Sequence, residues 1–278
     1  MKKKYTGYLF VLPHFLGVCL FLLLPFLDVV RRSFVQTAGG FCGLENFKTV
    51  LLNEAFRLAA GNTAKFTLVC LPLLLLLSLL LAALVYSMGK AAGVWKNCYL
   101  VPMAIPAACV ALLWKLLFDS HGLVNGVVTS FGGRAVDWMN TGSAFWVLVG
   151  SYLWKNTGYV MVLWIAALDG IPKTVYEAAK IDGAGTKAAF FYITLPCIRP
   201  AAFTIVVFSF LNSFQVFREA YLVAGNYPQE SIYLLQHVFH NWFLSLSVDK
   251  MAAGAVLLGL VAGGAVRLLQ RAWERQEK

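Results

Sequence analysis

Charged residues are scarce in this sequence. Only 13% of its 278 residues are Asp, Glu, Lys or Arg and 60% are hydrophobic, whereas soluble globular chains have about 25% charged and about 45–50% apolar residues. A soluble domain of this length could not bury so much apolar surface, so the bilayer is the expected solvent. The net charge of +10 comes from basic residues dispersed between apolar runs. Without a basic groove interleaved with aromatic residues, nucleic acid is excluded as a partner.

The sequence also lacks the motifs of common catalytic and metal sites. No GxxxxGK[ST] phosphate loop, G-x-S-x-G or H-E-x-x-H occurs, so we expect neither an ATPase nor one of these hydrolases. The six cysteines include no C-x-x-C pair, which argues against a disulfide framework or a zinc site. His237 and His240 lie three residues apart with no evident third ligand, so no metal site is expected. The expected protein is not an enzyme and holds no cofactor of its own.

Long stretches with few or no charged residues predict six transmembrane helices, because a helix needs about 20 mostly apolar residues to cross the hydrocarbon. The N-terminal stretch is longer than the apolar region of a signal peptide and lacks an A-x-A-like cleavage site, so we expect a retained span. The fold class is therefore an all-α integral membrane protein. The six expected spans lie between Lys4 and Asp28, Lys65 and Lys90, Lys96 and Lys115, Asp137 and Asp169, Arg199 and Arg218, and Lys250 and Arg267.

The distribution of basic residues predicts the orientation of these spans. Six spans place both termini on the same side of the membrane. If that side is the cytoplasm, thirteen Lys and Arg residues lie in inner segments and eight in outer ones, which agrees with the excess of positive charge on cytoplasmic loops. Arg31 and Arg32, just after the first span, point the other way. We expect both termini to be cytoplasmic.

A polar segment rich in small residues, "EAAKIDGAGTKAAFFYITLP", separates the fourth span from the fifth. Pro172 ends the preceding span, and Thr174-x-x-Glu177 predicts a capping box at a helix start. We expect a helix from Val175 to Asp182, a left-handed turn at Gly183, and a second helical piece from Thr186 to Ile193 that Pro196 stops. From these residues alone, the segment is either an interfacial linker helix or a knob that another protein binds.

The same segment carries a family resemblance. Glu177-Ala178-Ala179, Gly183, Ile193 and Leu195-Pro196 match the pattern EAA-x3-G-x9-I-x-LP throughout. This pattern resembles the signature loop of the permease subunits of bacterial binding-protein-dependent ABC importers of type I. The resemblance implies a coupling helix seated in a cleft of a cytoplasmic ATPase. Glu177, Ala178, Ala179, Asp182 and Gly183 would form its contact surface.

The resemblance extends over nearly the whole chain. "GLENFKTVLLNEAFRLAAGNTAKFT" and "VPMAIPAACVALLWKLLFDSHGLVN" are similar to carbohydrate-class permeases, and the Gly-Leu-x-Asn-Phe stretch to the first permease of maltose- and glycerol-phosphate-type pairs. The resemblance implies three parts of the chain. They are an N-terminal helix and outer loop at 1–57, a permease domain at 58–270 with the coupling loop at 172–197, and a cytoplasmic tail at 271–278.

The resemblance also implies a set of partners. These are a second homologous permease, two cytoplasmic ABC ATPase subunits that hold ATP and Mg, and an extracytoplasmic solute-binding protein, assembled at the bacterial cytoplasmic membrane and surrounded by its lipid. The implied function is import of a sugar or a related polyol or glycoside. An amino-acid or peptide permease, and a secondary transporter, are the alternatives. An integral membrane enzyme would need a polar catalytic cluster, which the sequence lacks.

The fifth span holds the candidate solute-contacting residues. Asn212 and Gln215 stand among Phe214 and Phe217 in "SFLNSFQVF", and amides beside aromatic faces suit a sugar. The alternative is hydrogen bonding between helices. In the resembling family this helix contributes to the translocation path, which favours a solute role.

Two further positions bear on this region. After the fifth span, Arg218 and Glu219 replace the single acid of many relatives, so we expect substrate preference or docking to differ from theirs. Within the fourth span, Lys155 is expected to snorkel or to pair across the helix bundle rather than to relay protons.

Overall fold

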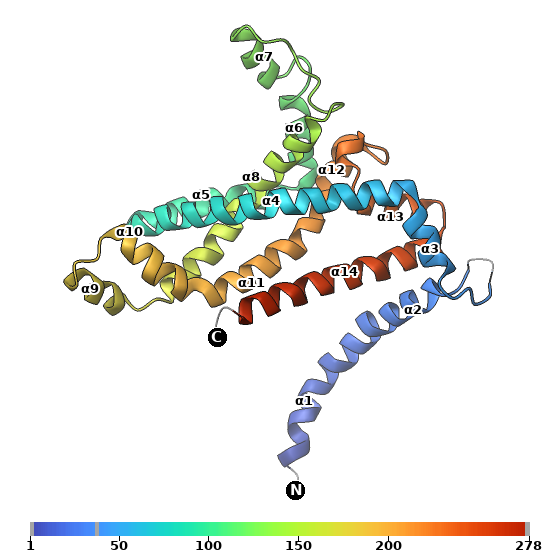
Figure 1. The fold of residues 1–278 in the computed structure, drawn as a ribbon, viewed down its shortest axis with the longest axis horizontal. Helices are drawn as coiled ribbons and strands as arrows, with labels where there is room; N and C mark the ends of the chain where they lie inside the picture. The colour runs from blue at the N-terminus through green and yellow to red at the C-terminus, as the bar shows by residue number, and fades with distance from the viewer. Residues whose placement is uncertain (1–2, 37–38, 276–278) are drawn as a thin grey trace. The chain divides into compact units, whose positions relative to one another are not determined.

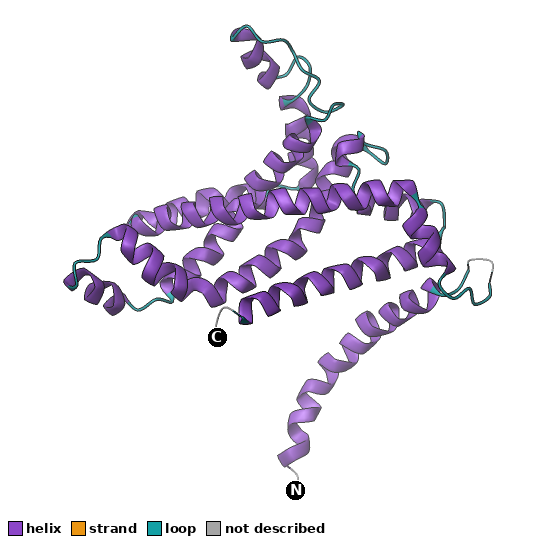
Figure 2. Cartoon of the chain, viewed as in Figure 1, coloured by secondary structure: helices purple, strands orange, loops and turns teal. Residues whose placement is uncertain are grey.

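Helices make up every secondary-structure element in the residues that the computed structural model describes, 3–36 and 39–275 (Figure 2). This confirms the expected all-α class. The chain forms two compact units. Among the described residues, unit 1 comprises those up to Arg57 and Val238–Arg275, and unit 2 comprises Leu58–His237. Each unit is described by itself.

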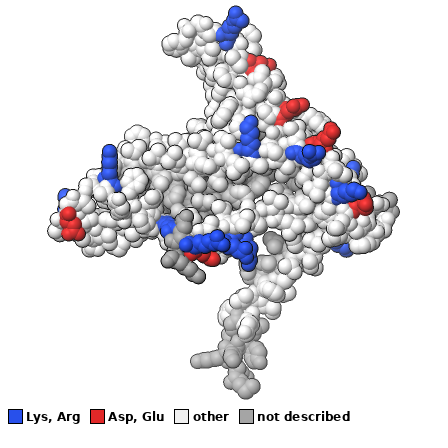
Figure 3. All heavy atoms as spheres, viewed as in Figure 1, with Lys and Arg blue, Asp and Glu red and all other residues white. Residues whose placement is uncertain are grey.

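The predicted spans correspond to long apolar helices and bent helix pairs. Four helices among the described residues are long and apolar enough to cross a membrane, and counting each bent pair as one span gives up to six. On the face shown in Figure 3, most of the surface carries uncharged residues. The four helices are Phe10–Ser33, Glu54–Ser87, Thr186–Ala224 and Val248–Glu274, and the pairs are Ala92–Ala104 with Ala107–Leu117 and Ala144–Asp169 with Lys173–Ile181.

Most helix ends differ from those that the charged residues predict. The last span, expected between Lys250 and Arg267, is α14 (Val248–Glu274), and the second, expected from Lys65, is α4 (Glu54–Ser87). A helix continues past its first ionic residue where that residue's long side chain reaches the interface or water. The criterion of charge-free length therefore locates the apolar segments but not the ends of their helices.

Unit 1 pairs the first helices of the chain with the last one. Asn46 closes the turn between α2 and α3, because its Nδ2 donates to the carbonyl oxygens of Ser33 at 3.1 Å and Val35 at 3.0 Å. Helix α14 packs along α2 and α3. The elements before α14 are α1 (Lys3–Val18), a π turn (Cys19–Leu23), α2 (Leu24–Ser33) and α3 (Glu45–Leu52).

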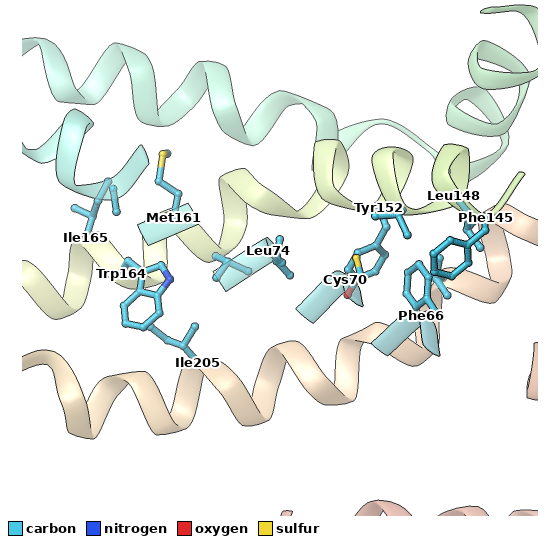
Figure 4. Packing of buried hydrophobic residues seen from close by; sticks show 14 of the residues in the cluster. Phe66, Cys70, Leu74, Phe145, Leu148, Tyr152, Met161, Trp164, Ile165 and Ile205 are labelled. Atoms are coloured by element: carbon cyan, nitrogen blue, oxygen red, sulfur yellow. The ribbon is translucent and has the colours of Figure 1, made fainter. Parts of the chain in front are cut away.

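The core of unit 2 lies between α4, α8 (Ala144–Asp169) and α11 (Leu195–Ser213). Figure 4 shows Leu74 of α4, Trp164 of α8 and Ile205 of α11 in this cluster. The buried indole Nε1 of Trp164 donates to Ser78 Oγ of α4 at 3.1 Å. Helix α8 buries residues around most of its circumference, as expected for a helix that is apolar on all sides. It is the central helix of the unit.

The third expected span is two helices that meet at a sharp bend. Helices α5 (Ala92–Ala104) and α6 (Ala107–Leu117) differ in direction by 89°. Pro106 causes the break, because it lacks an N–H and forces the preceding residue into an extended conformation. Ile105 accordingly has ψ 129°. The bend places the stretch 103–107 against α8 and α11 in the wall of a cavity.

The fifth span is longer than its expected limits of Arg199 and Arg218. Helix α11 continues through a tight turn at Phe214–Val216 into α12 (Phe217–Ala224), which ends at Gly225 with φ 73°. A short 3-10 turn (Glu230–Ile232) and α13 (Leu235–Leu244) follow. At the start of α13, the buried His237 accepts a hydrogen bond from the backbone N–H of Leu234 through Nδ1, at 3.1 Å. This histidine therefore has a structural role at a helix start.

The segment between α6 and α8 is organised by one buried amide. Asn125, in α7 (Leu123–Ser130), donates to the carbonyl oxygens of Asp119, Ser120 and Val136 and accepts from Trp138 Nε1. Hydrogen bonds from the Asn140 side chain and backbone hold the pKa of the nearby Asp137 carboxyl below its usual range. A loop with so many internal partners has a defined shape.

Candidate functional site

The EAA motif lies on α9 (Lys173–Ile181), a short helix bent by 67° from α8. The helix begins after Pro172, which occupies the N-cap position with an extended backbone (φ −60°, ψ 131°), and no side chain caps the helix. The expected capping box is therefore wrong: because the helix starts at Lys173, Thr174 lies inside the first turn and cannot act as the N-cap. In Figure 1, α9 stands at the end of unit 2 to which α8 and α11 lead.

Gly183 ends α9 as the sequence predicts. Its φ is +78°, and its N–H donates to the carbonyl oxygen of Lys180 while the N–H of Ala184 donates to that of Ala179. These two bonds form the Schellman arrangement, in which the left-handed residue is usually glycine. A Cβ at Gly183 would meet nothing within 4 Å, so the backbone angle alone requires glycine here.

The second helical piece does not stop at Pro196. Helix α10 (Thr186–Ala189) runs into a π turn (Phe190–Thr194), and α11 follows directly. Pro196 occupies the first turn of α11, where a missing N–H costs little, because the wider turn before it has already changed the hydrogen-bond register. The expected stop is corrected to a continuous helix from Thr186 to Ala224 with a π bulge in it.

The motif residues are presented to the surroundings to different degrees. On α9 and its terminal turn, Glu177, Ala178, Asp182 and Gly183 are exposed and Ala179 is half-buried. Farther along, Ile193 is half-buried and Leu195 and Pro196 are exposed. The apolar Ile181 at the end of α9 is 87% exposed. An exposed carboxylate beside small residues and an apolar tip forms a surface that another protein could cover.

A hydroxyl pair fixes this surface to the membrane helix. Tyr176 Oη lies 2.8 Å from Thr194 Oγ1. Since Thr194 also donates to the carbonyl oxygen of Ala189 at 3.4 Å, Tyr176 is the donor. Thr194 is buried and the Tyr176 ring packs against the core of unit 2. The sequence analysis missed this pair, although a tyrosine directly before the EAA motif on a short helix is a signal for it.

A cavity of about 480 Å³ lies in unit 2 where α5, α6, α8, α11 and α12 meet. The broken span lines it on one side and the middle of α8 on another. Its polar lining residues are Tyr152, Lys155, Asn156, Tyr159, Asn212, Gln215, Arg218 and Glu219. A volume of this size and so many hydrogen-bonding groups suit a small polar solute.

Two of the four residues that were expected to contact solute line the cavity, and the other two do not. Asn212 and Gln215 both line the cavity, and Gln215 Nε2 donates to Asn212 Oδ1 at 3.1 Å. Phe214 and Phe217 do not line it. Phe214 packs edge-on against Phe210, with ring centres 5.5 Å apart, and Phe217 packs against His237 at 4.8 Å. The amides face the cavity, while the two rings pack within the protein.

The lysine in the fourth span pairs across the bundle, as expected. Lys155 Nζ of α8 lies 2.6 Å from Glu219 Oε1 of α12, and their side chains are 14% and 13% exposed. Both residues line the cavity. Breaking a buried pair by removing one partner typically costs about 3–5 kcal/mol, because the other charge remains uncompensated. The pair therefore fixes α12 against α8.

Comparison with known proteins matches residues 74–275 to the family "Binding-protein-dependent transport system inner membrane component". The chain is 31% identical to the arabinooligosaccharides transport system permease protein of Bacillus subtilis (strain 168), over 92% of this chain and 83% of that protein. It is 32% identical to the trehalose/maltose transport system permease protein of Thermococcus litoralis (strain ATCC 51850 / DSM 5473 / JCM 8560 / NS-C), over 86% of each. A crystal structure of a bacterial alginate ABC transporter, in complex with alginate pentasaccharide-bound periplasmic protein, contains a chain with TM-score 0.85 and 22% identity, covering 100% of this chain and 96% of that one.

The fold and the motif thus define a membrane permease of the ABC importer class. The chain belongs to the family of binding-protein-dependent transport system inner membrane components. It has the type I ABC importer permease fold and several membrane-spanning helices. Its homologues are transport permease subunits.

Proposed function

We propose that this chain is the permease subunit of a sugar importer and that α9 is its contact with a cytoplasmic ATPase. The observation that carries the proposal is the exposed EAA helix, closed by a left-handed Gly183 and bonded to the start of α11 through Tyr176. A force applied to α9 would reach α11 through this short connection. The same α11 carries Asn212, at the cavity, nearer its other end.

The topology belongs to the same proposal. The bent pair α5 and α6 counts as one span and α8 without α9 as another, giving six spans with both termini in the cytoplasm. Residues 1–57 form an accessory helix and outer loop, 58–270 the permease domain with the coupling loop at 172–197, and 271–278 a tail. This arrangement places α9 in the cytoplasm and is supported by the excess of Lys and Arg in inner segments.

The proposed assembly contains a second, homologous permease subunit, two ATPase subunits and an extracytoplasmic solute-binding protein. The alginate transporter of the same fold is in complex with a periplasmic protein, which supports the last of these. ATP and Mg belong to the ATPase subunits, which carry out the hydrolysis. This chain supplies part of the path and the coupling loop.

A sugar or a related polyol or glycoside is the proposed solute. Two relatives are named for transport of arabinooligosaccharides and of trehalose and maltose, and the cavity amides suit hydroxyl groups. An amino-acid or peptide permease is the alternative, and a secondary transporter is disfavoured. The test is the uptake of sugar into proteoliposomes that contain the complete transporter and its binding protein. Uptake is compared with and without ATP on the side of the membrane that the ATPase subunits face.

Asn212→Ala and Gln215→Ala are each expected to lower the rate of ATP-driven sugar uptake about 5–30-fold, because each removes about 1–2 kcal/mol of hydrogen bonding. The ATPase rate without solute should stay the same, since neither residue lies near α9. The measurement is uptake and basal ATPase activity in the same proteoliposomes. Thr204→Ala, at an exposed position of α11 outside the cavity wall, is the control. Unchanged uptake in both cavity variants would remove the amides from the path.

Tyr176→Phe is expected to lower the amount of solute imported per ATP hydrolysed by about 2–10-fold, because it removes only the hydroxyl that fixes α9 to Thr194. Thr194→Val should have the same effect, and the double variant should be no worse than either single one. Thr194→Ser retains the hydroxyl and should restore coupling. Additive losses in the double variant would show that the two hydroxyl groups act independently.

A further inference from the structure

Three ionic side chains share the wall of the cavity in unit 2. They are Lys155 of α8 and the adjacent Arg218 and Glu219 of α12. Ionic groups on membrane-spanning helices are costly to desolvate, and those that face a cavity commonly act on what passes through it. Their charges therefore bear on which solutes the cavity accepts.

The three charges do not cancel. Glu219 is neutralised by Lys155 at 2.6 Å, and both side chains are largely buried. Arg218 is exposed to the cavity side, and no described carboxylate lies within 4 Å of its guanidinium. The pair and the arginine together carry one net positive charge. That charge resides on Arg218, the group with the most freedom to meet a solute.

The neighbouring groups provide hydrogen bonds around this charge. Gln215 Nε2 donates to Asn212 Oδ1, and the Asn212 amino group is a further donor in the cavity wall. Asn156 Nδ2 donates to the carbonyl oxygen of Tyr152 at 2.8 Å, which leaves its Oδ1 as an acceptor. Donors and acceptors together match sugar hydroxyls, whereas a guanidinium binds carboxylate or phosphate through two parallel N–H groups.

We propose that the solute is a carbohydrate that carries an anionic group and that Arg218 is the residue that selects it. This inference rests on the proposed import function and specifies its substrate class. The carboxylate of a uronate and a phosphate ester share the chemistry that the guanidinium recognises. The Lys155–Glu219 pair holds α12 in place, and the negative charge of Glu219 lowers the positive potential that the solute meets at the cavity wall.

The experiment uses the complete transporter with its binding protein in proteoliposomes, supplied with ATP and an equimolar mixture of oligosaccharides. The mixture contains neutral, uronate-bearing and phosphate-bearing members of matched length, and mass spectrometry identifies what enters. We expect uronate-bearing or phosphate-bearing sugars to enter in at least ten-fold excess over neutral ones. Comparing the uptake of these two kinds of sugar shows whether the anionic group is a carboxylate or a phosphate. Entry of neutral sugars at equal or greater rates overturns the inference and leaves the import function intact. If no sugar of any kind enters in an ATP-dependent manner, the import function itself is overturned.

Substitutions assign the selectivity to the cavity rather than to the binding protein, which is the same in every sample. Arg218→Gln should lower the ratio of anionic to neutral uptake at least ten-fold, and Glu219→Gln should raise it, because the net charge of the wall changes in opposite directions. Lys115→Gln removes an exposed positive charge of α6 outside the cavity wall and should leave the ratio unchanged. If Glu219→Gln does not fold, Arg218→Gln still decides, since Arg218 has no described ion-pair partner to lose. An unchanged ratio in Arg218→Gln overturns its assignment.

Discussion

Gly158→Ala is expected to destabilise the protein by about 3 kcal/mol or more, at or above the upper end of the usual cost of overpacking. A Cβ at Gly158 would lie 1.8 Å from the carbonyl oxygen of Tyr99 and 2.5 Å from its carbonyl carbon. Both groups are backbone, so no side-chain rotation relieves the overlap, and α5 must move away from α8. Since α5 leads into the bend that lines the cavity, its displacement would also open the cavity wall. Thermal unfolding in detergent measures the effect, and about 3 kcal/mol corresponds to a melting temperature lower by roughly 6–12 °C.

Gly150→Ala is the matched control for this prediction. Gly150 lies on the same helix, and a Cβ there would meet nothing within 4 Å. Because alanine is favoured over glycine in a helix interior by about 1 kcal/mol, this variant should be as stable as the parent or slightly more stable. Equal melting temperatures for the two variants would contradict the close approach of α5 to α8.

Glu177→Lys is expected to reduce ATP-driven uptake by about 30-fold to 1,000-fold while the protein still inserts in the membrane. The side chain is exposed on α9, so the substitution costs little stability in the permease alone. At a contact with the ATPase, however, it places an opposite charge in a partly desolvated interface, and a disrupted charge contact there costs about 2–5 kcal/mol. The stimulation of ATP hydrolysis by solute-loaded binding protein should be lost in parallel.

Glu274→Lys provides the control for this charge reversal. Glu274 is exposed at the end of α14 and lies outside the EAA motif, so its reversal changes the net charge equally without altering α9. We expect normal uptake from it. Normal uptake from Glu177→Lys as well would remove α9 from the coupling path.

The features that were predictable from the sequence depend on local physical rules. Apolar runs of about 20 residues require a bilayer, and a glycine after a short helix favours a left-handed cap, as found at Gly183. The pairing of Lys155 was predictable because a buried ammonium needs an opposite charge, although its partner Glu219 was not. Asn212 and Gln215 were selected as polar groups in an apolar helix, and they lie in the cavity wall.

The remaining features depend on contacts between segments distant in sequence. The cavity needs the bend at Pro106 to bring 103–107 against α8 and α11, and a proline alone does not reveal the direction of a bend. Tyr176 and Thr194 meet only because the Gly183 turn reverses the chain between them. Phe214 and Phe217 lie two and five residues after Asn212, on another face of the helix, and they pack against Phe210 and against His237 of α13 instead of lining the cavity. Each of these outcomes requires the three-dimensional arrangement.

Photo-cross-linking from α9 tests the central claim, that this helix binds the ATPase, most directly. A benzophenone amino acid replaces the exposed Ala178 in the complete transporter, with the same residue at the exposed Ser130 of α7 as the control. After irradiation, mass spectrometry identifies the cross-linked subunit. The account predicts adducts between position 178 and an ATPase subunit, and none with that subunit from position 130. Efficient labelling at 178 that reaches only lipid, the second permease or the binding protein would contradict it.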